Sequence, residues 1–257
     1  MNRILSLVRR CVEDYEMIAP NDRVAVGVSG GKDSLMLLTA LAKLREFYPI
    51  PFEVEAITLD MGHADGRPGM DFTPVARYCQ ELGVPYTLIP SEIHHIIFDV
   101  RKEKNPCSMC AKMRRGALHA AAEELACSKV ALGHHLDDAI ETFYMNLWRE
   151  GRIGCFSPVT ELSDRGLTLI RPLLLATEQE VRCAVKEEGF PIVKSRCPAD
   201  GVTTREDTKN FVRERCRTDR AFRQKTLHAL QESGIDGWRP LHPARTSKKE
   251  DTAHEEN

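Results

Sequence analysis

Six consecutive residues near the amino terminus have the types and spacing of a phosphate-binding loop. These residues are Ser29, Gly30, Gly31, Lys32, Asp33 and Ser34. A short apolar run rich in β-branched residues precedes them at 24–28, and an apolar helical pattern follows at 35–41. The first pattern predicts a buried parallel strand, and the second predicts a helix that begins near Ser34. Two glycines let an anion approach the backbone, while the first N–H groups of the helix and Lys32 supply positive charge. We therefore predict a cradle for a phosphate or a pyrophosphate.

The spacing distinguishes this loop from two common nucleotide-binding loops. A Walker loop has its first glycine five residues before the Gly-Lys pair and a Ser or Thr after it. Here those two positions are Val26 and Asp33, and the dinucleotide fingerprint G-x-G-x-x-G is not matched either. The stretch instead resembles the pyrophosphatase loop (PP-loop), Ser-Gly-Gly-x-Asp-Ser, of enzymes that split ATP between the α and β phosphates. An ordinary glycine turn is the simpler alternative, and six matching positions between a strand and a helix argue against it.

Composition indicates a soluble globular protein with one full core. The sequence has 257 residues, of which 42% are hydrophobic and 29% charged, and a formal net charge of −2. This charge indicates no general attraction to nucleic acid, so any such surface must be a local patch. No run approaches the roughly 18 apolar residues of a membrane span, and we expect a cytoplasmic protein without membrane contact. Nine cysteines in such a protein indicate metal or redox chemistry rather than disulfides.

Strand and helix patterns alternate along the sequence, which predicts an α/β fold. We expect a Rossmann-like parallel sheet of about five strands flanked by helices, with strands at 24–28, 52–59, 86–89, 129–132 and 167–170. Ligands of such sheets bind beyond the carboxyl ends of the strands, where Ser29 and Asp60 both fall. We divide the chain into an amino-terminal helix (1–20), a nucleotide-binding domain with a cysteine insert (21–200), a basic helical segment (201–235) and a disordered tail (236–257).

A Cys-x-x-Cys pair is the second chemical signal. Cys107 and Cys110 stand at the start of an alanine-rich helical pattern, where two thiolates would meet unpaired N–H groups. From the pair alone, an iron–sulfur cluster, a zinc site and a redox dithiol all remain possible. Zinc would need four ligands, and a dithiol would not need an ATP loop. We expect Cys11, Cys79, Cys127 and Cys183 to be small buried residues, and leave Cys155 and Cys216 as spare ligands.

The order of the motifs resembles the tRNA 2-thiocytidine synthetase family (TtcA-like proteins) over residues 20–215. The motifs are the loop at 29–34, Leu59-Asp60, the cysteine pair with Arg114-Arg115-Gly116, Gly-His-His-Leu-Asp-Asp at 133–138, and Arg171-Pro172-Leu173. The resemblance implies an ATP-dependent tRNA sulfurtransferase on a PP-loop fold of the adenine nucleotide α hydrolase type. It further implies a 4Fe-4S cluster on three cysteines, ATP and Mg²⁺, a sulfur donor that is either a cysteine desulfurase or sulfide, and a homodimer.

The resemblance also assigns residues to the cluster. Cys107 and Cys110 match the family's Cys-x-x-Cys, and Cys197 is the best third ligand. Members of the family carry a second Cys-x-x-Cys near this point, whereas this sequence has Ser-Arg-Cys-Pro at 195–198. The departure indicates a branch whose substrate differs.

For the nucleotide and the RNA, we assign three further groups of residues. The expected ATP-binding residues are Val28, Ser29, Gly30, Gly31, Lys32, Asp33, Ser34, Leu59, Asp60, Gly133 and His134. The expected catalytic residues are Lys32, Asp33 and Asp137, with Asp137 handling magnesium or a proton. Arg114, Arg115 and Arg213 are expected to contact RNA. Between residues 205 and 225, eight Lys or Arg stand against four acidic residues, although i,i+4 pairing accounts for part of this pattern.

The expected reaction is thiolation of a pyrimidine in tRNA. Adenylation of the C2 oxygen would make AMP the leaving group, and sulfur would replace it, most simply to give 2-thiocytidine at position 32. Two alternatives remain: a PP-loop ligase resembling tRNA lysidine synthetase, and an ATP-binding iron–sulfur sensor without turnover. A sulfurtransferase that uses a cysteine persulfide without a cluster is a variant of the first interpretation.

Overall fold

The five predicted strands form one parallel sheet, and a sixth, antiparallel strand joins its edge. The computed structural model describes residues 1–63, 69–103, 106–194, 197 and 205–242. The sheet order is β3-β2-β1-β4-β6-β5, and every neighbouring pair is parallel except β5 and β6. The strands are β1 (Asp22–Gly27), β2 (Phe52–Asp60), β3 (Tyr86–Pro90), β4 (Lys129–Ala131), β5 (Val159–Leu162) and β6 (Leu167–Ile170). The α/β prediction is confirmed.

The sixth strand was not predicted. β5 has four residues with the sequence Val-Thr-Glu-Leu, and it returns into β6 through the short 3-10 turn η2 (Ser163–Arg165) and Gly166 at φ +62°. An edge strand needs burial on one face only, so its sequence lacks the continuous apolar run found in β1. This explains why the stretch resembles a loop in sequence.

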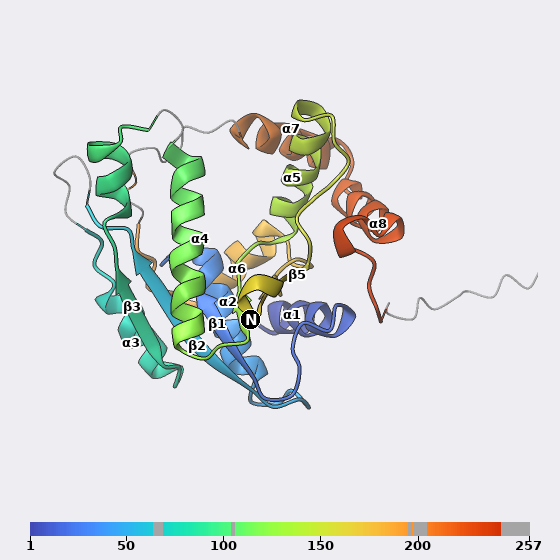
Figure 1. The fold of residues 1–257 in the computed structure, drawn as a ribbon. Coiled ribbons are helices and arrows are strands. Elements are labelled where there is room, and N and C mark those ends of the chain that lie inside the picture. Colours follow the sequence, from blue (N-terminus) through green and yellow to red (C-terminus); the bar gives the residue numbers. More distant parts are fainter. Residues whose placement is uncertain (64–68, 104–105, 195–196, 198–204, 243–257) are drawn as a thin grey trace, which may run out of the picture.

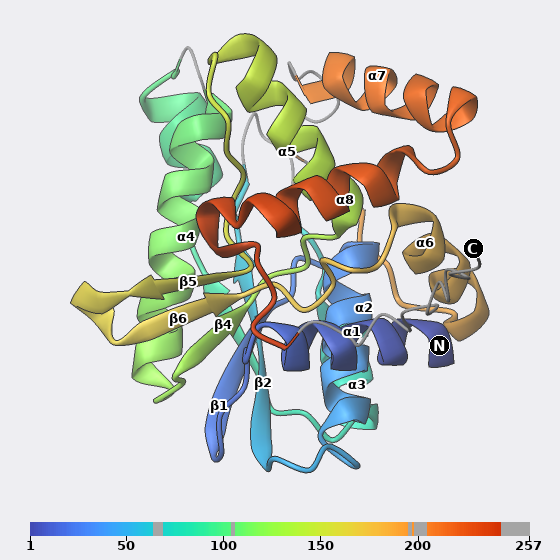
Figure 2. The same cartoon turned by 90° about the vertical axis from the view of Figure 1, so that its right-hand side faces the viewer.

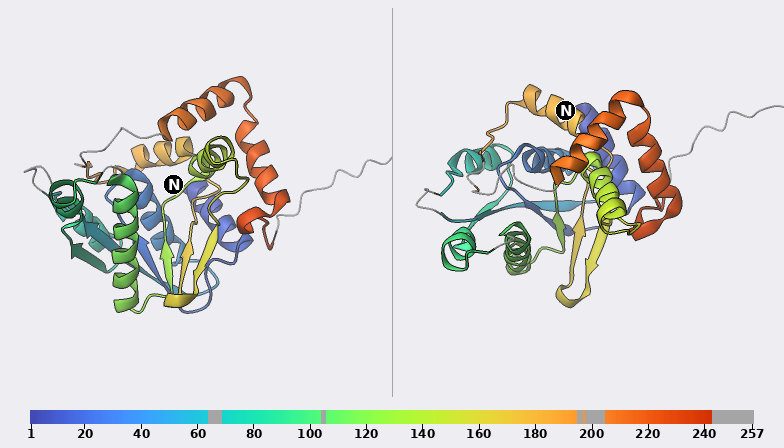
Figure 3. Two further views of the ribbon diagram at one scale, coloured as in Figure 1. Left: turned by 45° about the horizontal axis from the view of Figure 1, so that its top comes forward. Right: turned by 90° about the horizontal axis from the view of Figure 1, so that it is seen from above.

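The helices form a layer on each face of the sheet (Figures 1 and 3). They are α1 (Asn2–Asp14), α2 (Lys32–Leu44), α3 (Thr73–Glu81), the π-helix η1 (His95–Val100), α4 (Pro106–Glu124), α5 (Leu136–Arg149), α6 (Glu178–Glu188), α7 (Arg205–Thr218), α8 (Phe222–Ser233) and the 3-10 turn η3 (Ile235–Gly237). The largest hydrophobic cluster joins Val24 and Val26 of β1 to α1, α2, α3 and α6. The opposite face of β1, at Ala25, packs under α4. Alternate residues of one strand therefore serve the two layers.

Small residues let α4 approach the sheet closely. Ala121 and Ala122 of α4 pack on Ala25, and a Cβ atom added to Gly27 would lie 3.0 Å from Leu118 Cδ2. The amino-terminal end of α4, which carries the cysteine pair, extends past the carboxyl edge of the sheet (Figure 1). The Cys-x-x-Cys is thereby brought to the edge where the loop at 29–34 lies.

The carboxyl-terminal helices pack on α5 (Figure 2). The predicted basic helical segment (201–235) contains two described helices, because α7 ends at Thr218 and α8 begins at Phe222. Asp219 Oδ1 accepts the N–H of Ala221 at 2.9 Å, so its side chain closes a turn in place of the helical bond. The tail boundary predicted at residue 236 is also too early, since Trp238 is fully buried. Residues 243–257 lie outside the described part of the chain.

Candidate active site at the carboxyl edge of the sheet

The loop at 29–34 connects β1 to α2 and is tied together by its own serines. Ser34 Oγ accepts the Ser29 N–H at 3.1 Å and donates to the Gly31 carbonyl at 2.9 Å. Helix α2 begins at Lys32, so the N–H groups of its first turn, which the helix itself cannot satisfy, point out of this loop. The loop therefore offers backbone donors and the positive end of a helix dipole to an anion.

Gly30 lets a distant segment pack against the loop. Its φ is +81°, a left-handed conformation that disfavours other residues. Val193 donates its N–H to the Gly30 carbonyl at 3.0 Å, and a Cβ atom on Gly30 would lie only 2.9 Å from Val193 Cβ. This contact brings the segment that leads to Cys197 onto the loop.

A cavity of about 560 Å³ lies beside the loop, within the size range of small-ligand sites. It collects most of the residues predicted to bind the nucleotide. Those on its wall are Val28, Ser29, Gly31, Asp33, Ser34, Leu59, Gly133 and His134. Gly30, Lys32 and Asp60 do not line it. Asp60 Oδ1 accepts the N–H of Gly62 at 3.0 Å, so this side chain shapes the turn after β2 while its neighbours Leu59 and Met61 form the wall.

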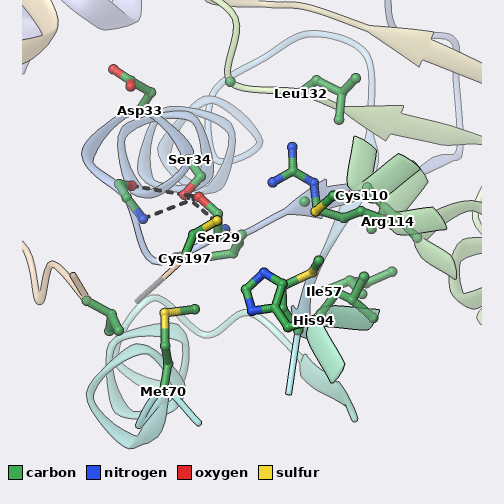
Figure 4. A pocket seen from close by; sticks show the side chains of 18 of the residues that line it. Ser29, Asp33, Ser34, Ile57, Met70, His94, Cys110, Arg114, Leu132 and Cys197 are labelled. Atoms are coloured by element: carbon green, nitrogen blue, oxygen red, sulfur yellow. Dashed lines mark hydrogen bonds between the residues drawn. The ribbon is translucent and has the colours of Figure 1, made fainter. Parts of the chain in front are cut away.

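Two of the three predicted cluster ligands face the same cavity. Cys110 and Cys197 both line it, with Cys197 on the side of Ser29 and Cys110 on the side of Arg114 (Figure 4).

The pKa of the Cys110 thiol is raised, mainly by burial. Arg114 acts to lower this pKa, and Cys197 and Cys107 act to raise it. Cys107, on the first turn of α4, is exposed and does not line the cavity. Within the described residues, no three Cys, His, Asp or Glu side chains are grouped so that they could hold a single metal ion.

The other cysteines range from buried to exposed, with Cys216 half-buried. Cys11, Cys79 and Cys127 are buried, as predicted for small apolar residues, and so is Cys155. Cys183 is exposed on α6, so its predicted burial is wrong. The periodicity of α6 places it off the apolar side formed by Val181, Ala184 and Val185.

Of the three arginines expected to contact RNA, one reaches the cavity. Arg114 lines it one turn after Cys110, and His94, from the segment before η1, lies nearby. The pKa of His94 is lowered, mainly by burial. Asp60 acts to raise this pKa, and Arg114 acts to lower it. Arg115 and Arg213 are exposed and lie elsewhere, Arg213 donating to Asn210 Oδ1 at 2.8 Å.

Lys32, predicted to hold phosphate, is occupied by carboxylates. Its Nζ lies 2.7 Å from Asp33 Oδ1 and 3.3 Å from Glu178 Oε1, at the start of α6. Burial raises the pKa of Glu178, but Lys32 and Lys209 and a hydrogen bond from Arg182 outweigh it and lower the pKa to about 2. The lysine therefore docks α6 against the loop in this structure.

The two aspartates that follow the histidine pair point in different directions. Asp137, predicted to handle magnesium or a proton, does not line the cavity. Its carboxylate accepts the N–H of Glu178 at 2.7 Å and Arg223 Nε at 2.6 Å, which ties α6 and α8 to α5. Asp138 lines the cavity instead, and its Oδ2 accepts the His135 N–H at 2.9 Å. Of the two acids in this motif, Asp138 therefore faces the cavity, and the catalytic role of Asp137 stays a prediction.

Gly133 serves a close contact within the protein. A Cβ atom there would lie 3.1 Å from the carbonyl carbon of Asp33, so the expected space for nucleotide is partly filled by the start of α2. The next residue, His134, faces the cavity with its ring against Phe156, centroids 5.0 Å apart. Arg171 stacks over the same Phe156 ring at 5.1 Å, and burial lowers the Arg171 pKa to about 10. Arg171 of the Arg-Pro-Leu motif thus contacts the Phe156 ring that packs against the wall residue His134.

Several wall residues carried no recognised signal in the sequence. His94, Met70 and Val193 come from three different segments and belong to no motif. Asp138 stands in the motif at 133–138, but no role was assigned to it from the sequence. His94 precedes the π-helix η1, an irregularity typical of functional sites that the sequence pattern does not indicate. Among the described helices, none is long and apolar enough to cross a membrane.

Comparisons with known proteins agree with this geometry. The family model described as "PP-loop domain" matches residues 4–217. A tRNA-cytidine(32) 2-sulfurtransferase of Geobacter sulfurreducens is 37% identical over 232 residues, which span 89% of this chain and 88% of that protein. The protein of the same name from Pelobacter propionicus is 40% identical over 203 residues, 78% of this chain and 74% of that one.

A solved structure shares the fold. The U34-tRNA thiolase NcsA from Methanococcus maripaludis, with its [4Fe-4S] cluster, superposes with a TM-score of 0.73 at 23% identity, covering 89% of this chain and 77% of that one. Together with the matched sequences and the loop geometry, this assigns the chain to the PP-loop family and, within it, to the family of the tRNA-cytidine(32) 2-sulfurtransferases.

Proposed function

We propose that this protein is an ATP-dependent tRNA sulfurtransferase that converts cytidine 32 of tRNA to 2-thiocytidine. The observation that carries the proposal is the shared cavity. One wall is a PP-loop and the other carries Cys110, with Cys197 beside the loop. Relatives named for this reaction cover most of the chain.

The chemistry requires an activated oxygen. The C2 carbonyl of cytidine is a poor electrophile, and its oxygen is a bad leaving group. Attack of that oxygen on the α-phosphorus of ATP forms a C2–O–P bond and releases pyrophosphate. Sulfide then adds at C2, the C2–O bond breaks, and AMP leaves with the original oxygen. No net oxidation or reduction occurs when the sulfur arrives as sulfide.

The loop would bind the phosphates. The N–H groups at the start of α2 and the hydroxyls of Ser29 and Ser34 face the cavity and can hold pyrophosphate as it forms. Ile57 and Leu59, at the end of β2, give an apolar surface for adenine. Asp33 and Asp138 are carboxylates on the same wall, and oxygen ligands of this kind suit Mg²⁺.

The cysteines fit an iron–sulfur cluster. Thiolates are its usual ligands, and Cys107 and Cys197 both lie close enough to Cys110 to raise its pKa. Burial raises the pKa of Cys110. A cluster ligand must be a thiolate, and cluster iron would supply the positive charge that stabilises it. Cys107, Cys110 and Cys197 would hold a 4Fe-4S cluster, and the cluster would supply a place where sulfur is kept for transfer.

The remaining partners follow from this chemistry. The sulfur comes either as free sulfide or from a cysteine desulfurase, whose persulfide releases sulfide when a thiol reductant supplies two electrons. Thiol reductants, ATP and tRNA are found together in the cytoplasm, where we place the protein. Arg114 lies where it can neutralise a phosphate of the ATP or of the RNA. The homodimer that the family resemblance implies is checked by light scattering.

The two alternatives have less support. A lysidine-type ligase has no use for cysteines on the cavity wall. A sensor without turnover would have no reason to match sulfurtransferases over nine-tenths of the chain.

Mass spectrometry of tRNA nucleosides from cells lacking the protein tests the proposal. Loss of 2-thiocytidine, with return on complementation, is expected. Loss of another thionucleoside would agree with the proposed mechanism but would show that a different base is modified. Unchanged levels of all thionucleosides would overturn the proposal.

A further inference from the structure

An apolar surface with basic residues lies at the far end of α5. We call it the α5 end surface and define it by Leu147, Trp148 and Ile153 with Arg149 and Arg152. Trp148 is 50% exposed and Ile153 is 69% exposed. Large apolar side chains that are exposed close together in sequence at the end of a helix are candidates for a binding surface.

The Trp148 ring is held in place by α7. It packs edge-on against Phe211, with ring centroids 4.1 Å apart at 82°, and contacts Tyr144 at 5.5 Å. Arg215 covers Phe211 at 5.2 Å. A tryptophan that is fixed on one side and open on the other loses little entropy when a flat ligand stacks on it.

The charges around the ring are available to an anionic partner. Arg149 pairs with Asp207 at 2.9 Å and Arg152 with Glu150 at 3.4 Å, and all four side chains are at least 43% exposed. Exposed pairs of this kind contribute little to stability, so a phosphate can replace the carboxylate at low cost. Aromatic rings beside arginines are the features that bind single-stranded nucleic acid.

The α5 end surface lies on the same side of the molecule as the cavity. Helix α5 starts at the cavity wall with Asp138, and Trp148 lies ten residues further, about 15 Å along the helix axis. The carboxyl-terminal end of α5, helix α7 and the amino-terminal end of α4 are found at one end of the molecule, beyond the carboxyl edge of the sheet (Figures 1 and 2). A strand that enters the cavity can pass over this surface.

We propose that Trp148 stacks on an unpaired tRNA base a few nucleotides from the base in the cavity, and that Arg149, Arg152 and Arg215 bind the adjoining phosphates. The inference rests on the proposed function and adds how the RNA is held. A second copy of the chain is the other conceivable occupant. A two-fold dimer would, however, place the same arginines of both copies together, which like-charge repulsion disfavours.

Tryptophan fluorescence gives a direct test, because the protein has only two tryptophans and Trp238 is fully buried. Titration with unmodified tRNA should quench the fluorescence of Trp148 and reduce the further quenching of this residue by acrylamide. Trp148→Phe, which retains Trp238, should lose the quenching and still bind tRNA almost normally. Trp148→Ala should weaken tRNA binding roughly tenfold and raise KM for tRNA with little change in kcat.

Phe47→Ala is the matched control, since Phe47 is also about half exposed but follows the carboxyl end of α2. It should leave the tRNA affinity unchanged. If Trp148→Ala bound tRNA as tightly as wild type and Trp148→Phe do, the inference would be overturned while the proposed function stands. A dimer that Trp148→Ala dissociates without a loss of RNA affinity would overturn it as well. A wild-type protein that binds no tRNA would instead overturn the proposed function.

Discussion

Asp137 and Asp138 are adjacent in sequence but have different surroundings. Asp137 is buried and joins three helices through Glu178 and Arg223, whereas Asp138 faces the cavity. We expect Asp138→Asn to lower the rate of tRNA-dependent AMP formation at least about 100-fold, the usual range for loss of an acid–base group. Its thermal midpoint should stay near wild type, because the amide oxygen can still accept the His135 N–H.

Asp137→Asn is the matched variant with the opposite expected outcome. The substitution removes the charge that Arg223 faces, and should lower the free energy of unfolding by about 1–3 kcal/mol in urea titrations. If the variant kept wild-type stability and lost turnover, the assignment of the two aspartates would have to be reversed.

Gly30 is a second residue whose role depends on geometry. Gly30→Ala forces a left-handed backbone on alanine and puts Cβ against Val193, so we expect a loss of at least about 1–2 kcal/mol of stability and of ATP affinity. The same change at Gly116, in the middle of α4 with open space around it, should stabilise the protein by about 0.5–1 kcal/mol. Chemical denaturation of the two variants checks both signs. Equal stabilities would contradict this account of the loop.

At the residue scale, the sequence was sufficient to find motifs but not to orient every side chain. Both aspartates were evident after His135, yet one step along a helix turns a side chain by about 100°. The orientation is set by His135, whose ring nitrogen accepts the Asp138 N–H at 3.3 Å and starts α5. A cap of this kind formed by histidine is unusual.

At the scale of elements, α6 is docked on the loop through one carboxylate. The folded-state pKa of Glu178 is about 2 and its unfolded value is near 4.3, so the stabilisation is complete above that value and is lost as pH falls toward 2. Glu178→Gln should therefore destabilise the protein at pH 7, and the difference from wild type should shrink by roughly 2–3 kcal/mol as pH falls from 5 to 2.

Free energies of unfolding measured at several pH values between 5 and 2 check this prediction. Glu161→Gln, on an exposed position of β5, serves as the control and should run parallel to wild type. A constant difference between Glu178→Gln and wild type would show that the carboxylate does not contribute through its charge.

Elements were predictable where one pattern dominated. The apolar run at 24–28 marks β1, and the capping box of α6, Thr177 with Glu180, is visible in the sequence and present in the structure. The edge strand β5, the π-helix η1 and the break between α7 and α8 were missed. Each depends on packing or on one side chain, such as Asp219, rather than on periodicity.

At the scale of the whole molecule, the site joins segments that are far apart in sequence. Cys110 and Cys197 are separated by 87 positions, and the Val193–Gly30 hydrogen bond brings the second segment to the loop. The sequence indicated Cys197 only through the family resemblance, because no local pattern reports a contact across that distance. Its place on the cavity wall is what the structure adds.

Cysteine substitutions test whether these segments hold a cluster together. After anaerobic reconstitution, Cys107→Ser, Cys110→Ser and Cys197→Ser should each lose most of the bound iron and the broad visible absorbance of an iron–sulfur protein. Cys183→Ser, an exposed cysteine on α6, should keep both. Removal of iron by a chelator should abolish thiolation while ATP binding persists. Full iron in Cys197→Ser would exclude that residue as a ligand.

The most direct test of the central claim is to follow the oxygen that sulfur replaces. A tRNA with ¹⁸O at C2 of cytidine 32 is incubated with ATP, sulfide and the reconstituted protein, and the nucleotide products are analysed by mass spectrometry. We predict one AMP per 2-thiocytidine, with the ¹⁸O in the phosphate of AMP. Formation of ADP, or of AMP without the label, would contradict adenylation of the base.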